Sequence, residues 1–117
     1  MRLNQLDIIT VDVPKVTAFL TALLGIEPTV AEERFAEFDI DGFTLMLSPD
    51  ALIPVGPARG VILHIEVADA DAAVERGRAA GATVLRDPAN TDWGTYSALV
   101  AGPAETIVDL YHPTVAE

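Results

Sequence analysis

The chain lacks cysteine altogether, so disulfide bonds, thiolate metal sites and a cysteine nucleophile are excluded. It also lacks long hydrophobic runs. Hydrophobic residues make up 50% of the 117 residues, yet no run approaches the roughly 20 apolar residues that a membrane-spanning helix needs. At the N-terminus, Asp7 interrupts any apolar segment of the signal-peptide type. We therefore expect a cytoplasmic protein that does not associate with membranes.

Basic residues are scarce. Seven Lys and Arg residues stand against eighteen Asp and Glu residues, which gives a formal net charge of −11. Such a chain would repel nucleic acids, because binding to them depends on Lys and Arg neutralising phosphates. Cationic small molecules would be attracted, in a manner that salt screens. The same charge could also serve solubility alone, so it excludes a nucleic-acid partner more firmly than it identifies a ligand.

A length of 117 residues suits one domain and is too short for two independent ones. Alternation over residues 8–14 predicts a strand, and Pro14 is suited to the first turn of a helix. Apolar residues at helical spacing then predict a helix over residues 14–24. Gly25 would end this helix as its C-cap.

The same unit occurs a second time. Residues 61–67 again predict a strand, and residues 70–80 predict a helix that Gly81 closes. A shift of 56 positions superposes Gly25 on Gly81 together with the strand and helix before each glycine. Two copies of one unit in so short a chain indicate an internal repeat.

Strand-like segments follow each predicted helix. They are residues 29–30, 34–40 and 43–48 in the first copy and residues 83–86, 96–101 and 106–111 in the second. Asp41 and Gly42 predict a hairpin turn, and the segment 49–60, rich in proline and glycine, predicts a linker. We expect an α+β fold class. A single domain, residues 1–117, would hold two tandem βαβββ modules, about residues 1–50 and 60–113, in a curved mixed sheet shaped as a cup, with the helices on its outer face.

In the order and spacing of its motifs, the chain resembles the vicinal oxygen chelate superfamily, which includes glyoxalase, bleomycin-resistance proteins and extradiol dioxygenases. The stretches that carry the resemblance are 9–13 with Phe19, 24–26, 66–74, 79–81, 87–88, 93–94 and 107–110. The resemblance covers nearly the whole chain. It implies the paired-module cup described above and a symmetric homodimer.

The resemblance also implies where a metal would bind, with one ligand from the first and one from the last strand of each module. Those four positions are Gln5, Met46, Ile62 and Asp109. Gln5 and Asp109 offer oxygen ligands, but a thioether is a soft ligand and Ile62 offers no donor. Because a catalytic zinc-type site needs about three protein ligands, we expect no metal and no other cofactor.

The period of two along a strand predicts which side chains face into the cup. The polar ones are Gln5, Asp7, His64, Glu66, Asp109 and Tyr111, with Thr44, Met46 and Ser48 from the fourth strand. Burying these carboxylates without partners would cost several kcal/mol each. Water, raised pKa values, a cationic ligand or a displaced metal held by His64, Glu66 and Asp109 would each compensate. Alternatively, His64 hydrogen-bonds to Glu66 or Tyr111, and Asp7 lies in solvent at the rim.

These features favour a metal-free small-molecule binding protein, similar to the bleomycin-resistance branch, that sequesters a cationic or aromatic ligand such as an antibiotic. Its aromatic walls would be Phe35, Phe38, Trp93 and Tyr96, which could stack on a planar or cationic ligand. Asp7, Glu66 and Asp109 would supply negative potential. Trp93 could instead cover a dimer interface.

Two alternatives remain open at the level of sequence. A glyoxalase-like isomerase, lyase or thiol transferase would need a metal to polarise a carbonyl, or His64 or Glu66 as a general base. The missing ligands make the chain less suited to such an enzyme. The other alternative is an inert or regulatory dimer, since a fold does not imply a function.

Overall fold

The computed structural model describes residues 1–50 and 60–114, which fall into two compact units, Met1–Pro57 and Ala58–Glu117. We call them module 1 and module 2, and each is described by itself. The predicted linker, residues 49–60, lies almost entirely outside the described residues. No helix in the described part of the chain is long and apolar enough to cross a membrane.

Module 1 has the order β1 (Gln5–Ile9), α1 (Val13–Leu24), β2 (Val30–Ala31), β3 (Ala36–Ile40) and β4 (Phe43–Ser48). Its four-stranded sheet has the strand order β1-β4-β3-β2, in which β1 runs parallel to β4 and the other pairs are antiparallel. Module 2 repeats this topology with β5 (Leu63–Glu66), α2 (Ala70–Ala79), β6 (Thr83–Asn90), β7 (Thr95–Ala101) and β8 (Ile107–Pro113). Its strand order is β5-β8-β7-β6, and a 3-10 turn, Pro103–Glu105, precedes β8. The expected α+β architecture of two tandem βαβββ modules is confirmed.

Local capping explains where the helices begin and end. Asp12 accepts a hydrogen bond from the Lys15 backbone N–H at 3.1 Å, and Gly25 ends α1 in the left-handed region with φ 69°. Asp69 caps α2 in the same way, through the Ala72 N–H at 3.2 Å. The strand predicted over residues 8–14 is therefore wrong in its bounds. It begins and ends earlier, as β1, because Asp12 already belongs to the helix cap.

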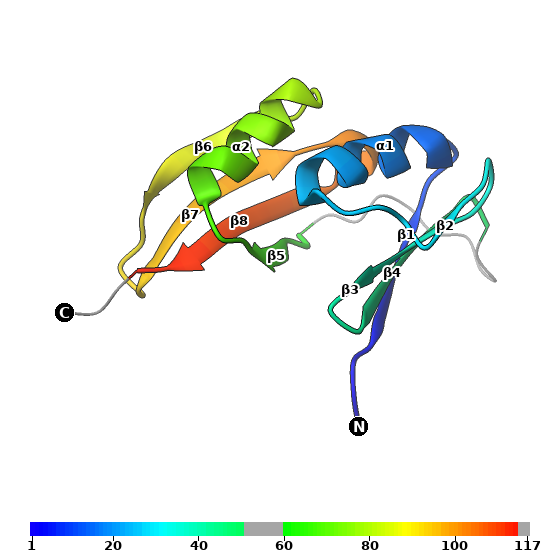
Figure 1. Ribbon diagram of the computed structural model, residues 1–117, viewed down its shortest axis with the longest axis horizontal. Coiled ribbons are helices and arrows are strands. Elements are labelled where there is room, and N and C mark those ends of the chain that lie inside the picture. The colour runs from blue at the N-terminus through cyan, green and yellow to red at the C-terminus, as the bar shows by residue number, and fades with distance from the viewer. Residues whose placement is uncertain (51–59, 115–117) are drawn as a thin grey trace. The chain divides into compact units, whose positions relative to one another are not determined.

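Each helix covers one face of its own sheet. In module 2, α2 lies along β6, β7 and β8 (Figure 1). The side chains between helix and sheet are almost fully buried. They are Val13, Val16, Phe19, Leu20, Leu23, Ala36, Phe38, Leu45 and Leu47 in module 1, and Ala70, Ala73, Val74, Ala98, Val100, Val108 and Leu110 in module 2. Because strand side chains alternate, the residues between these point to the face of each sheet opposite its own helix, which we call the distal face.

Strand β6 differs most from the expected strand. The sequence predicts it over residues 83–86, but it continues to Asn90. Its pairing with β7 shifts register between Val84 and Arg86 and again between Arg86 and Ala89. Pro88 is tolerated inside this strand because β6 is the edge of the sheet and because bulges relax its pairing. The actual turn is confined to the residues between Asn90 and Thr95.

Candidate functional site

Asp109 lies on β8 between the two strands that flank it in module 2. In the parallel pair of β5 and β8, His64 is directly beside Asp109. In the antiparallel pair of β7 and β8, Leu99 lies opposite Asp109, so Ser97 lies diagonally across from it on the same face. The distal face of module 2 thus brings a carboxylate, an imidazole and a hydroxyl together from three strands.

Both carboxylate oxygens of Asp109 are engaged. Ser97 Oγ donates to Oδ1 at 2.6 Å, and His64 Nδ1 lies 2.7 Å from Oδ2. Asp109 is only 7% exposed and Ser97 only 5%. A buried carboxylate without partners would be costly, and here two short, charge-assisted contacts compensate for its desolvation. Asp109 therefore satisfies its hydrogen bonds within its own module.

His64 is held at one side and open at the other. Its side chain is 64% exposed, although Nδ1 contacts Asp109. Its ring also meets the ring of Tyr111 edge-on, with centroids 6.5 Å apart. The alternative that His64 hydrogen-bonds to Glu66 or Tyr111 is therefore wrong about the partner residue. The partner is Asp109, because the parallel register of β5 and β8 places Asp109 directly beside His64. An imidazole oriented by a carboxylate can accept or transfer a proton at its free nitrogen.

Glu66 pairs with Tyr111 across β5 and β8 and is exposed. It lies two residues from His64 on the same face, so it adds negative charge beside the imidazole. His64, Glu66 and Asp109, considered above as ligands of a displaced metal, do not converge on a common point in the described residues. Within residues 1–50 and 60–114, no three His, Cys, Asp or Glu side chains are arranged to hold a metal.

In module 1, the distal face brings Gln5, Asp7 and Met46 together. Gln5 Nε2 donates to Asp7 Oδ1 at 2.8 Å and lies 3.9 Å from Met46 Sδ. Asp7 is exposed, in agreement with the alternative that placed it in solvent. The three side chains come from adjacent parallel strands, because Asp7 pairs directly with Met46.

The family's metal positions do not fit a metal in this chain. The amide nitrogen of Gln5 faces the thioether of Met46 where a carboxylate ligand would be needed. Ile62 carries no donor atom, and Asp109 already uses both oxygens on Ser97 and His64. A divalent ion would have to break two short hydrogen bonds to gain one carboxylate.

Two of the four aromatic side chains predicted to line the site, Phe38 and Tyr96, lie on the helix side of their sheets and not on the distal face. Phe38 is fully buried beneath α1, because it pairs with Leu45 and shares its side of the sheet. Tyr96 lies on the α2 side of β7, where its hydroxyl donates to Asp71 Oδ1 at 2.8 Å. This hydrogen bond, followed by burial and the charges of Asp71 and Asp69, raises the pKa of Tyr96. Phe35 is half-buried in the turn before β3.

Trp93 is 70% exposed at the tip of the hairpin between β6 and β7. The tip is well ordered by hydrogen bonds, since Thr91 N donates to Thr95 O at 2.8 Å and Thr114 N donates to Gly94 O at 2.9 Å. Thr95 lies four positions along β7 from Leu99, the residue opposite Asp109. At about 3.3 Å per residue, the tip is roughly 13 Å along the strand from Asp109. The Trp93 side chain is thus accessible from solvent. Both interpretations from the sequence, contact with a ligand and contact with a second protein subunit, stay open.

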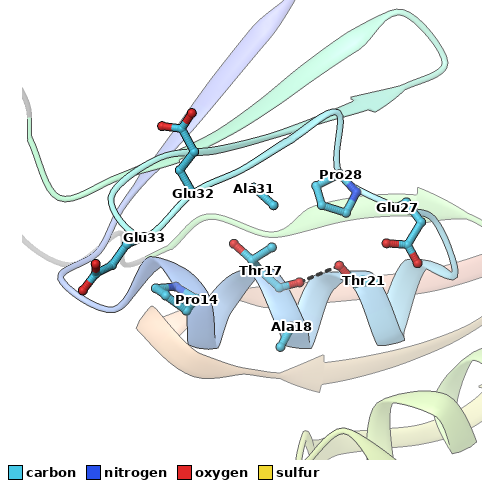
Figure 2. Close-up of a pocket in the computed structure, with 9 residues that line it drawn as sticks. All are labelled: Pro14, Thr17, Ala18, Thr21, Glu27, Pro28, Ala31, Glu32 and Glu33. Carbon is cyan, nitrogen blue, oxygen red and sulfur yellow. Dashed lines mark hydrogen bonds between the residues drawn. The ribbon is translucent and has the colours of Figure 1, made fainter.

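Module 1 also carries a groove of about 430 Å³ that the sequence did not predict. Figure 2 shows Pro28 and Ala31 facing the Thr17 and Thr21 side of α1. The remaining lining residues are Pro14, Ala18, Glu27, Glu32 and Glu33. The Thr21 hydroxyl is already used, because it donates to the Thr17 carbonyl at 2.8 Å. None of these residues belongs to the predicted site.

Ser97 is the member of the Asp109 cluster that sequence reasoning missed. Serine in a strand carries no chemical signature, and only the register between β7 and β8 places it next to Asp109. That register depends on how the turn of residues 102–106 closes. The short turn has two non-glycine residues at positive φ, Ala104 and Glu105, which a sequence pattern does not predict.

Comparisons with known proteins agree with this architecture. The family model of the Glyoxalase/Bleomycin resistance protein/Dioxygenase superfamily matches residues 2–110. No protein of curated function matches. A solved structure described as a conserved domain protein is 44% identical and covers 97% of this chain and 100% of its own, with a TM-score of 0.86.

Two further structures share the fold at low identity. A glyoxalase-related enzyme from Fulvimarina pelagi is 19% identical over 96% of this chain and 88% of its own, with a TM-score of 0.84. A glyoxalase/bleomycin resistance protein/dioxygenase family enzyme from Burkholderia phytofirmans PsJN is 19% identical over 97% of this chain and 99% of its own, with a TM-score of 0.79. Since the family model spans nearly the whole sequence, the chain belongs to the Glyoxalase/Bleomycin resistance protein/Dioxygenase superfamily.

Proposed function

We propose that this protein binds a cationic, partly aromatic small molecule, such as an antibiotic, and sequesters it without a metal. The observation that carries the proposal is the state of Asp109, whose two oxygens are taken by Ser97 and His64. A carboxylate held in this way contributes charge and orientation rather than an open coordination position.

The charges around the site support a cationic ligand. The net charge of the chain is −11, and Glu66 lies exposed beside His64 on the distal face. A field of this sign raises the local concentration of cations and speeds their association. The rings of Tyr111 and His64 are arranged in a T shape with centroids 6.5 Å apart, and Tyr111 is half-buried on the same face. This combination suits a ligand with a positive group and an apolar body.

Calorimetric titration with cationic aromatic antibiotics and with uncharged analogues tests the proposal. We expect the cationic compounds to bind more tightly and their affinity to fall as salt rises. Glu66→Gln should weaken binding up to about fivefold, the range of one exposed charge pair. Glu75→Gln, which removes an exposed carboxylate on α2, is the matched control and should change affinity little.

Metal analysis gives the decisive contrary result. A stoichiometric divalent ion in the purified protein, lost together with its thermal shift in Asp109→Ala, would overturn the proposal. Binding of neutral and cationic analogues with equal affinity would remove its electrostatic part.

A second function has one observation in its favour, the 2.7 Å contact between His64 and Asp109. A carboxylate-oriented imidazole is suited to act as a general base in a metal-independent proton transfer. Deuterium incorporation next to the carbonyl of hydroxyacetone in heavy water would reveal this activity. If wild type and His64→Phe show the same rate, this alternative is excluded for that substrate.

A further inference from the structure

The hydrogen bonds at Asp109 determine which nitrogen of His64 carries its hydrogen. An ionised carboxylate can only accept hydrogen bonds. Asp109 Oδ1 already accepts from Ser97 Oγ at 2.6 Å, and Oδ2 lies 2.7 Å from His64 Nδ1. The Nδ1 atom must therefore be the donor. In the neutral imidazole the other nitrogen, Nε2, is then an acceptor.

This acceptor is available to a ligand. The His64 side chain is 64% exposed, whereas the carboxylate that orients it is only 10% exposed at its side chain. The Asp109 contact and the edge-on ring of Tyr111 restrain the imidazole from two directions. The distal face of module 2 therefore presents a lone pair of fixed orientation next to the negative charge of Glu66.

We propose that His64 Nε2 accepts a hydrogen bond from an N–H group of the ligand. Ser97 and Asp109 act as positioning residues, because they keep the hydrogen of the His64 ring on Nδ1. The inference rests on the binding function proposed above and narrows its ligand class. The ligand is a protonated amine or amidine, in which charge and N–H donor coincide. A quaternary ammonium has the charge without the donor and is discriminated against.

Two probes separate charge from hydrogen bonding. Benzamidine is an aromatic cation with N–H donors, and phenyltrimethylammonium is an aromatic cation without them. At about pH 8.5 we expect benzamidine to bind about 3- to 10-fold more tightly, the value of one hydrogen bond. In His64→Phe, which keeps a ring at this position, the preference should disappear while both cations still bind.

Asp109→Asn tests the role of the positioning residues. The asparagine oxygen can still accept from Ser97, and its amide nitrogen then donates to His64 Nδ1, which moves the hydrogen to Nε2. The preference for benzamidine should be lost. Nitrogen-15 NMR of the ring should show the Nδ1–H tautomer in the wild type and the Nε2–H tautomer in the variant. Tyr96→Phe, on the opposite face of the sheet, is the control and should preserve both readouts.

The outcomes distinguish this inference from the function on which it rests. Equal affinity of the wild type for both cations, or an Nε2–H tautomer in the wild type, would overturn the inference and leave cation binding intact. If neither cation binds in calorimetry, the proposed function fails at this face, and the inference fails with it.

Discussion

At the scale of single residues, Ser97 is the most informative side chain because it has no role except through Asp109. Ser97→Ala would leave Asp109 Oδ1 buried without a hydrogen-bond donor. We expect a loss of about 1–3 kcal/mol in the free energy of unfolding, measured by urea denaturation. Thr83→Ala removes an exposed hydroxyl from a strand of the same sheet and should cost no more than about 0.5 kcal/mol. Equal losses in the two variants would mean that water replaces Ser97.

Other residues show what the sequence could have indicated and what it could not. The burial of Phe38 follows from its pairing with Leu45, and the alternation of β3 already places it on the side of Ala36 and away from Glu37. The partnership of His64 with Asp109 needs the parallel register of β5 and β8, which only the folded chain provides. Chemistry carried by one residue is visible in the sequence, whereas a contact between three strands is not.

At the scale of elements, Tyr96 connects β7 to the first turn of α2 through its hydrogen bond to Asp71. That bond is the main cause of the raised pKa of Tyr96. Because the pKa is higher in the folded than in the unfolded chain, the neutral phenol stabilises the fold at pH values below about 10. This contribution is lost as the pH rises above that value.

Absorbance titration checks this coupling. The chain has two tyrosines, so in a Tyr111→Phe background Tyr96 is the only one. We expect its ionisation midpoint to lie above the usual value and to fall when Asp71→Asn is added. A midpoint that does not respond to Asp71→Asn would show that the hydrogen bond is absent in solution.

The helices were predicted more accurately than the strands, for a local reason. The ends of α1 depend on Asp12 and Gly25, which act on backbone groups close to them in the sequence. Such capping residues can be recognised from the sequence alone. The extent of β6 depends instead on pairing with β7, which carries the strand through Asp87 and Pro88 despite their preference for turns. The tandem modules were predictable because a repeat shows itself along the chain, but their registers were not.

At the scale of the whole molecule, the family resemblance leads us to expect a homodimer, and Trp93 is an exposed side chain that could take part in it. Light scattering should then give a mass of twice 12.4 kDa. If Trp93 lies in the interface, its fluorescence emission should shift to the red on dilution, and Trp93→Ser should favour the monomer. If the protein is a dimer whose Trp93 emission does not change when dilution separates the two subunits, Trp93 lies outside the interface and is free to contact a ligand. A single-chain mass at all concentrations would contradict the expected dimer.

The edge strand β6 has a consequence for how the protein behaves when it is concentrated. Pro88 has no amide hydrogen to donate, and two register shifts interrupt the even spacing of donors and acceptors along this edge strand. A strand from a neighbouring molecule would find no continuous ladder there. Growth of the sheet from molecule to molecule is thereby blocked on this side. Pro88→Val would restore one amide hydrogen while the two register shifts remain, so we expect a small rise in aggregation at high concentration, measured by light scattering, with little change in the fold.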